Sequence, residues 1–336
     1  MASSVESPAQ SAAWAHPVLA SAAVVHPLCR DVLLDRAKLA AVADWMRFEE
    51  FASLESVASD PARPSLASPQ QQIDFTLVTV AINFAYTDFE TQIPWSVSVE
   101  GVELIDADAM FARFEQAHAA GIPVLDGAWL AQVGTEQLGA VLHGPREIPL
   151  LAERAAVLRT IGAVLVEHYE GRFWRFVESC DPRAFADGNG LVERLVAEFS
   201  PFDDSSVLHG EPVTILKLAQ LGVWTLHRLG LVHLEDVDSL AVFADYIVPA
   251  ALRAMNVLSY SPPLAEAVDT GQIIPAGSDW ENEIRMQTIY ACGVLTEALN
   301  ARRPGPDLIN PQIDYRFWSA FHNLIRPHHL TITTAY

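Results

Sequence analysis

The segment Ile215-Leu-Lys-Leu-Ala-Gln-Leu-Gly222 lies inside a helical pattern that spans residues 211–229. Similar patterns occupy much of the chain on both sides of it. Because their apolar residues recur at helical spacing, they predict amphipathic helices near residues 31–48, 106–121, 126–133, 148–170, 190–199, 211–229, 235–241, 246–255, 281–300 and 311–324. The sequence therefore predicts a mainly α fold.

Two segments predict a small β element beside these helices. Phe75–Asn83 is apolar and rich in β-branched residues, which indicates a buried strand or another buried segment. Trp95–Glu100 alternates with period two, which is typical of a strand with one solvated face. Residues 56–72 hold three prolines and predict a loop. Alternating βαβ units, a GxGxxG motif and a P-loop are missing, which disfavours Rossmann and Walker-type nucleotide enzymes.

Length and composition indicate one large unit. The chain has 336 residues, of which 51% are hydrophobic, and it shows neither an internal repeat nor a strong linker. Residues 1–15 are predicted to be a mobile tail and residues 16–336 a single domain. The N-terminus has no signal-peptide pattern, and no apolar run reaches about 18 residues. Three scattered cysteines fit a reducing compartment, so we expect a cytoplasmic protein without a membrane span.

The net charge limits the possible partners. Formal charge is −21, with 42 acidic against 21 basic residues and no Lys/Arg cluster. Proteins that bind DNA or RNA meet the phosphate backbone with basic surfaces, so a polymeric nucleic acid is disfavoured. A single nucleotide needs only one cationic pocket and remains possible as a substrate. Oligomeric state is not predicted.

Lys217 is the first candidate site residue, because it stands among apolar residues on a predicted helix and shares a face with Gln220. An isolated ammonium group is costly to remove from water. The lysine must therefore extend to solvent or meet an anion. Both alternatives stay open: a lysine that snorkels to solvent, or a partner for a phosphate or carboxylate.

Asp245 lies in Phe243-Ala-Asp-Tyr-Ile-Val-Pro249, just before a helix whose first turn suits the proline. The positive end of the helix dipole favours an ionised carboxylate at this place. Phe243 and Tyr246 flank it with flat apolar surfaces that suit a ring-shaped ligand. A helix N-cap is the commoner use of such an aspartate and remains an alternative.

The segment Gly277-Ser-Asp-Trp-Glu-Asn-Glu-Ile-Arg285 holds three acidic residues and one arginine. Glu281 and Arg285 are four residues apart on a predicted helix, so a surface salt bridge is the simplest interpretation. Glu283 points to another face of that helix. If that face borders a pocket, its carboxylate could accept hydrogen bonds from the donor edge of a base.

Weaker candidate site residues lie before and after these segments in the chain. Asn83 follows the apolar segment and serves either as a turn residue or as a polar group beside a site. His328 and His329 are adjacent, and sequence neighbours rarely bind one metal ion together. No HExxH motif or third ligand at a telling spacing is present, so no metal site is expected.

Taken in order, several of these segments resemble the queuosine salvage protein family. The resemblance runs from about residue 75 to the C-terminus and rests on Asn83-Phe84, Lys217 with Ala219-Gln220, Phe243-Ala-Asp-Tyr246 with Pro249, Gly277-Ser278 with Glu281, Glu283-Ile-Arg285, Ile313-Asp-Tyr315 with Trp318, and Pro327-His-His329. The chain departs from the family pattern at Tyr86–Glu90, Leu218 and Ile247.

The resemblance implies a helical fold similar to that of the helix-hairpin-helix DNA glycosylases, in which an essential aspartate follows a helical hairpin. The run from Leu216, through a turn at Leu229-Gly230, to Asp245 is consistent with it. The implied activity is hydrolysis of queuosine 5′-phosphate to queuine and ribose 5-phosphate, with no cofactor.

Cleavage of an N-glycoside builds positive charge on the ribose in an oxocarbenium-like transition state. We expect Asp245 to stabilise that cation and to orient or deprotonate the attacking water. Lys217 with His328 or His329 is expected at the phosphate, Phe243, Tyr246 and Trp318 around the base, and Asn83, Glu283 and Asp314 at its polar edges. The other expected substrate contacts are Phe84, Tyr86 and Arg285.

Two rival classes of function remain. A DNA-repair base glycosylase would share the chemistry but needs a basic groove, which the charge of −21 disfavours. A non-catalytic helical nucleotide-binding protein would keep the pocket and lack turnover.

Overall fold

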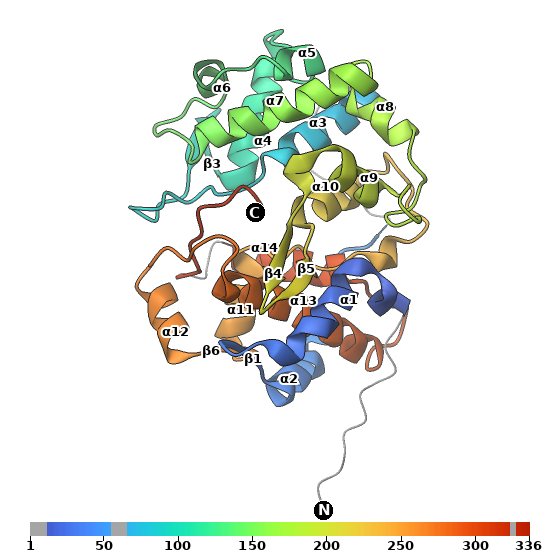
Figure 1. Ribbon diagram of the computed structural model, residues 1–336, viewed down its shortest axis with the longest axis vertical. Helices are drawn as coiled ribbons and strands as arrows, with labels where there is room; N and C mark the ends of the chain where they lie inside the picture. Colours follow the sequence, from blue (N-terminus) through green and yellow to red (C-terminus); the bar gives the residue numbers. More distant parts are fainter. Residues whose placement is uncertain (1–11, 55–65, 323–326) are drawn as a thin grey trace, which may run out of the picture.

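Helices form two packed groups, one above the other, in the computed structural model, which describes residues 12–54, 66–322 and 327–336 (Figure 1). The upper group contains α3 (Pro69–Ala81), α4 (Asp106–Ala119), α5 (Gly127–Leu130), α6 (Thr135–Val141), α7 (Leu151–His168), α8 (Phe173–Glu178), α9 (Leu191–Glu198) and α10 (Lys217–Arg228). The lower group contains α1 (Pro17–Val25), α2 (Arg36–Met46), α11 (Ile247–Ala254), α12 (Pro262–Asp269), α13 (Asp279–Asn300) and α14 (Asn310–Phe321). The predicted mainly α fold is confirmed.

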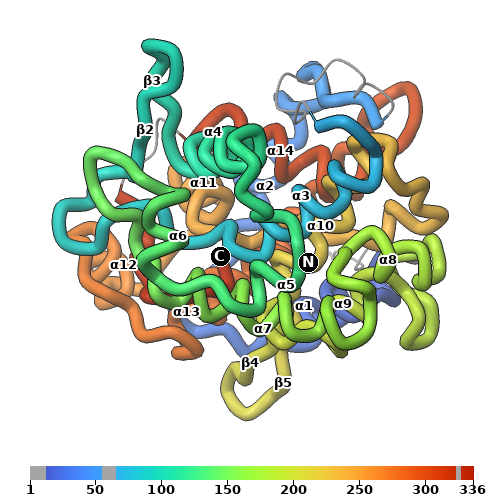
Figure 2. The backbone as a smooth tube through the Cα atoms, turned by 90° about the horizontal axis from the view of Figure 1, so that it is seen from above, coloured from blue at the N-terminus to red at the C-terminus, as the bar shows by residue number. Residues whose placement is uncertain are grey.

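Three small antiparallel sheets occur in the described part of the chain. One is non-local: β1 (Val32–Leu34) pairs with β6 (Leu258–Tyr260). The other two are hairpins that project from the body of the molecule at two different places (Figure 2). They join β2 (Ser96–Val99) to β3 (Val102–Ile105), and β4 (Ser205–Leu208) to β5 (Glu211–Thr214). The strand predicted at residues 95–100 is therefore confirmed as β2.

The segment 75–83, interpreted as a strand or another buried segment, is buried but helical. It lies in α3, which begins at Pro69 after Ser68, whose hydroxyl accepts a hydrogen bond from the Gln71 amide. Every residue from Gln72 to Ala81 is buried. A helix that is covered on all sides shows no apolar stripe, so its sequence cannot be told from a buried strand by periodicity.

The N-terminal predictions also need correction. The helix predicted from residue 31 begins only at Arg36, because residues 32–34 form β1 and Asp35 caps α2 by accepting from the Lys38 amide at 2.9 Å. Most of the predicted mobile tail, residues 1–11, lies outside the described residues. Ala12–Ala15 form a 3-10 turn in which buried Trp14 donates from Nε1 to Glu297 at 2.7 Å, so this end of the predicted tail is packed.

Other boundaries shift by a few residues. The helix predicted at 211–229 begins only at Lys217, because the hairpin of β4 and β5 occupies residues 205–214. The pattern at 235–241 forms only a 3-10 turn, Val237–Ser239. Of the loop predicted at 56–72, residues 55–65 lie outside the described part and residues 69–72 belong to α3. Helices α4, α5, α7, α9, α11, α13 and α14 lie where helices were predicted.

The last residues of the chain run back between the two helical groups (Figures 1 and 2). Ala85 donates its amide to the carbonyl of Tyr336 at 3.1 Å, and the Tyr336 side chain is buried. The C-terminal segment thereby forms part of the region where the groups meet. Across the described ranges, none of the helices has both the length and the apolar character that crossing a bilayer requires.

Candidate active site

A cavity of about 450 Å³ lies between the two helical groups. Its size falls within the roughly 300–1,000 Å³ usual for small-molecule sites. Walls from the upper group come from α3, α4 and α10, and those from the lower group come from residues 243–247 and α14. Aromatic rings cover much of the lining: Phe75, Phe84, Tyr86, Phe111, Trp224, Phe243, Tyr246, Tyr315, Trp318 and Tyr336. Such walls suit a flat, ring-shaped ligand.

Asp245 lines this cavity and also caps a helix. Its Oδ1 accepts hydrogen bonds from the amides of Ile247 at 2.7 Å and Val248 at 3.2 Å, at the start of α11. Both interpretations of this aspartate are thus compatible. Burial raises the pKa of Asp245 above its usual value, although the Lys217 ammonium and the two amides oppose that rise. The carboxylate is therefore anchored in place but poorly solvated.

Lys217 is the first residue of α10 and does not extend to solvent. Its side chain is buried against the cavity, where Nζ donates to the carbonyl oxygen of Asn83 at 3.2 Å. Burial lowers the pKa of Lys217, and the negative charge of Asp245 counteracts that effect. The interpretation as a snorkelling lysine is wrong, and a cation shares the cavity with a carboxylate.

Asn83 and the two aromatic residues after it form one wall of the cavity, as predicted. Fully buried Arg154 of α7 holds this wall by donating to the carbonyls of Ile82, Phe84 and Ala85. Its guanidinium carbon lies 4.4 Å from the centre of the Phe84 ring. The carbonyl of Asn83, which lies between these residues in the chain, accepts instead from Lys217 Nζ.

Asp314 is the second carboxyl group on the cavity wall, from α14. Its Oδ2 accepts from the amide of Phe243 at 2.8 Å, which ties α14 to the segment that carries Asp245. Burial, together with the negative charge of Asp245, raises the pKa of Asp314 well above its usual value. The neutral carboxyl form of Asp314, which can donate a hydrogen bond, is therefore favoured.

Rings lie on the cavity wall at the three predicted base contacts, Phe243, Tyr246 and Trp318. His328 stacks on Tyr246 with ring centres 4.4 Å apart, and His322 stacks on Trp318 at 4.3 Å. His328 is buried and is not among the described lining residues, so it supports the Tyr246 ring from behind or beside. His322 itself lines the cavity next to Trp318.

The predicted phosphate contact His329 also lies outside the lining. Its Nε2 is 3.1 Å from the hydroxyl of Tyr336, and burial lowers its pKa to about 3. A neutral imidazole brings no positive charge to a phosphate. Neither histidine of the Pro-His-His segment therefore supplies the expected cation to the cavity.

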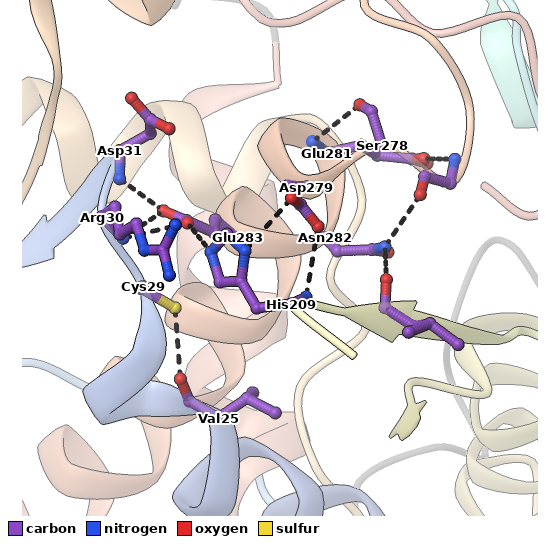
Figure 3. Close-up of polar contacts among 12 residues, drawn as sticks. Val25, Cys29, Arg30, Asp31, His209, Ser278, Asp279, Glu281, Asn282 and Glu283 are labelled. Atoms are coloured by element: carbon purple, nitrogen blue, oxygen red, sulfur yellow. Dashed lines mark hydrogen bonds and ion pairs between the residues drawn. The ribbon is translucent and has the colours of Figure 1, made fainter. Parts of the chain in front are cut away.

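Glu283 is in the wrong place to contact a base. Its fully buried carboxylate accepts from the amides of Arg30, Asp31 and Val32 at 2.6–2.9 Å and lies 2.8 Å from His209 Nε2 (Figure 3). These contacts tie α13 to β1 and to the tip of the hairpin of β4 and β5. Glu283 is thus a structural anchor and not one of the described lining residues.

Arg285 does not pair with Glu281, contrary to the simplest interpretation of the sequence. It is buried and donates to both carboxylate oxygens of Asp204, at 2.8 and 2.6 Å. Glu281 instead accepts a hydrogen bond from the amide of Gly277 at the start of α13. Arg285 is not among the described lining residues either, so a direct contact with substrate is not supported.

We expect Glu283→Gln to lower the free energy of unfolding by about 2–4 kcal/mol, because an amide cannot accept all of these hydrogen bonds and leaves buried donors unsatisfied. Urea denaturation measures this change, and the exposed Glu266→Gln on α12 is the surface control. If the variant has normal stability and a raised KM for the nucleotide, Glu283 contacts the substrate and is not a structural anchor.

Several lining residues were not identified from the sequence. Trp224 and Arg228 follow Lys217 on one face of α10, at seven and eleven residues, so helical spacing could have indicated both. The guanidinium carbon of Arg228 lies 4.5 Å from the centre of the Tyr315 ring. Tyr336 reaches the cavity only through the path of the C-terminal segment, for which the sequence carries no signal.

Within residues 12–54, 66–322 and 327–336, no group of three or more His, Cys, Asp or Glu side chains is arranged to hold an ion.

Comparison with known proteins identifies similar chains. A family model described as queuosine salvage protein matches residues 63–336. The Queuosine 5′-phosphate N-glycosylase/hydrolase of Sphaerobacter thermophilus is 33% identical over 270 residues, which cover 78% of this chain and 81% of that protein. Proteins of the same name from Schizosaccharomyces pombe and Mus musculus are 26% and 27% identical, over 90% and 89% of this chain and 90% of each relative.

Proposed function

This chain belongs to the queuosine salvage protein family, and we propose that it hydrolyses queuosine 5′-phosphate to queuine and ribose 5-phosphate. One observation carries the proposal at the level of residues: Asp245 and Lys217 share an aromatic cavity whose volume suits a mononucleotide. These two residues line the same cavity although 28 positions separate them in the chain.

Asp245 is the proposed catalytic residue. As the glycosidic bond breaks, its electron pair leaves with the base and the ribose gains positive charge. The Asp245 carboxylate stabilises that charge and orients the water that attacks the sugar. Since its Oδ1 is already bound to two amides of α11, the group is held in position before the substrate arrives.

Asp314 is proposed to donate a hydrogen bond to the leaving base. A neutral carboxyl can donate a hydrogen bond to the base as negative charge accumulates there. The raised pKa of Asp314 favours that form, and the bond to the Phe243 amide fixes its position. Phe243 and Tyr246 would hold the plane of the base between apolar surfaces.

Positive charge for the 5′-phosphate comes from Lys217 and Arg228, which both line the cavity. Contacts to a phosphate remote from the reacting bond can hold the sugar in a reactive geometry and so contribute to the rate. The placement of the two histidines does not support their role in phosphate binding.

We further propose one catalytic domain over residues 16–336 and a kinship with helix-hairpin-helix glycosylases. The single-domain proposal is supported by a buried hydrophobic cluster with members in both helical groups. For the kinship, α10 ends in a turn where Gly230 has a φ of +64°, and Asp245 precedes α11. The second helix of the implied hairpin is only a 3-10 turn, which is a departure.

We expect the purified protein to release free queuine from queuosine 5′-phosphate and none from queuosine within full-length tRNA. The net charge of −21 repels a polyanion over the long screening distance of low salt, about 30 Å at 0.01 M. A mononucleotide meets the same field but enters a cavity with its own cations. Chromatography of both reactions measures the difference.

Gel-shift assays with tRNA at low salt should show no complex. Free queuine from tRNA, or a tight salt-sensitive complex, would favour a polymer-acting glycosylase instead. If the protein binds the nucleotide without cleaving it, the rival function of a non-catalytic nucleotide-binding protein is the correct one.

A further inference from the structure

A buried ion pair beneath the cavity contacts both segments that carry the proposed catalytic pair. Arg285 of α13 donates from Nη1 and Nη2 to Asp204 at 2.8 and 2.6 Å. Its Nε donates to the carbonyl of Ala244 at 3.0 Å. The planar guanidinium also lies 4.3 Å from the ring centre of Tyr336, a cavity-lining residue. Each of its three nitrogens thus donates a hydrogen bond to a fixed partner.

Asp204 contacts the start of α10 from the other side of the pair. Its Oδ2 accepts from the amide of Lys217 at 3.1 Å, and its backbone carbonyl accepts from Ile215 at 3.1 Å. Between these two residues, Leu216 has a φ of +55°, in the left-handed region that disfavours residues with a side chain. Such a conformation persists only where surrounding contacts impose it. Asp204 supplies those contacts at the residue that directs Lys217 into the cavity.

We propose that the Arg285–Asp204 ion pair is the positioning element that sets the distance between Lys217 and Asp245. One partner binds the amide of Lys217, and the other binds the carbonyl of the residue just before Asp245. Neither lies among the described lining residues, so both act through the two residues they hold. The inference rests on the proposed function, because it assigns a role to that same site.

The rest of the hairpin of β4 and β5 is held by the same helix. Asn282 donates from Nδ2 to Ser206 Oγ at 2.9 Å. His209 at the hairpin tip lies between Asp279 at 3.1 Å and Glu283 at 2.8 Å (Figure 3). Helix α13 thereby contacts the hairpin at its tip, its middle and its base. Only the contact at the base, through Asp204, is joined directly to Lys217, which provides an internal comparison.

Arg285→Lys tests the geometry of the pair. Lysine keeps the charge but cannot bind Asp204 with two donors and the Ala244 carbonyl with a third. We expect kcat for queuosine 5′-phosphate to fall on the order of 10- to 100-fold, the cost of a displacement of about 1 Å. Since Lys217 is also a proposed phosphate contact, KM should rise too, and kcat at saturating substrate is the quantity that reports on the positioning of the pair. Asp204→Glu keeps both charges, moves the carboxylate by one methylene, and should lower kcat in the same range.

Asp204→Asn tests the charge of the pair through the pH profile of kcat. Asp245 faces Lys217 of α10, Arg285 of α13 and Asp314 of α14, and both cations lower its pKa. Removing the Asp204 charge leaves Arg285 uncompensated, so the pKa of Asp245 falls further. Because the reaction needs the Asp245 carboxylate, the acidic limb of the profile should move to lower pH.

His209→Gln is the matched control, because it weakens the hairpin at the tip and leaves its base intact. We expect lower thermal stability with kcat and pH profile near those of the unaltered protein. Wild-type turnover tests the proposed function separately from the positioning role. If Arg285→Lys and Asp204→Glu, assayed where circular dichroism shows them folded, keep normal kcat, the pair is only structural. The same conclusion follows if neither folds and Asp204→Asn retains an unshifted acidic limb.

Discussion

Asp245→Asn is expected to reduce turnover of queuosine 5′-phosphate by at least about 100-fold, the usual contribution of a positioned acid–base group. Asparagine keeps the side-chain oxygen that accepts from Ile247 and Val248, so the start of α11 should stay capped. What it removes is the negative charge that faces the ribose. Single-turnover release of queuine measures the effect, with thermal unfolding as a check on the fold.

Asp35→Asn is the matched control for this variant. Asp35 caps α2 through the amide of Lys38 and is not among the described residues that line the cavity. Its exchange should leave turnover unaltered. If Asp245→Asn also turned over substrate at a near-normal rate, Asp245 would be only a helix cap and the cavity would need another catalytic group.

Lys217→Met is expected to have the second large effect, a fall in kcat/KM on the order of 100-fold, as for loss of a buried group that stabilises charge in an active site. The ammonium group lowers the pKa of Asp245, which burial alone would raise further. Without that charge, the pKa of Asp245 increases, and the acidic limb of the rate profile moves to higher pH. This direction is opposite to the one expected for Asp204→Asn.

Calorimetry of the same variant tests phosphate binding. If Lys217 contacts the phosphate, queuosine 5′-phosphate should lose more affinity than the unphosphorylated nucleoside. The chain contains one other lysine, the exposed Lys38, so Lys38→Met is a direct control. Equal weakening of both ligands, together with an unshifted rate profile, would make Lys217 a structural residue.

Sequence patterns could predict the parts of the site that depend on local chemistry. Asp245 was found because an acid before a helix start, between aromatic residues, has a local physical meaning, and Lys217 because a cation on an apolar helix face needs a partner. The structure places both on one cavity. Phe243 and Tyr246, which flank Asp245 in the sequence, line the cavity with it, whereas Trp318 of α14 was indicated only by the family resemblance.

The predictions that were wrong depended on distant partners. Arg285 has a sequence-local acid in Glu281, yet it pairs with Asp204, 81 residues earlier. Glu283 binds amides more than 250 residues away, at the start of β1. A resemblance in sequence indicates that such residues matter to a family but not what they touch. The burial of α3 on all sides likewise removed the periodic signal that would have identified it as a helix.

The pairing of β1 with β6, and of residues 30–32 with Glu283, has a consequence for how the chain is made. Residue 32 emerges from a ribosome 251 residues before its partner Glu283. At synthesis rates of about 5–20 residues per second, that interval lasts roughly 10–50 s. Through this time Val32, which the finished protein buries, lacks the β6 strand and the Glu283 carboxylate that hold its strand in place. Apolar residues exposed on a nascent chain are the ones that chaperones shield, so the docking of the N-terminal strand depends on the timing of translation.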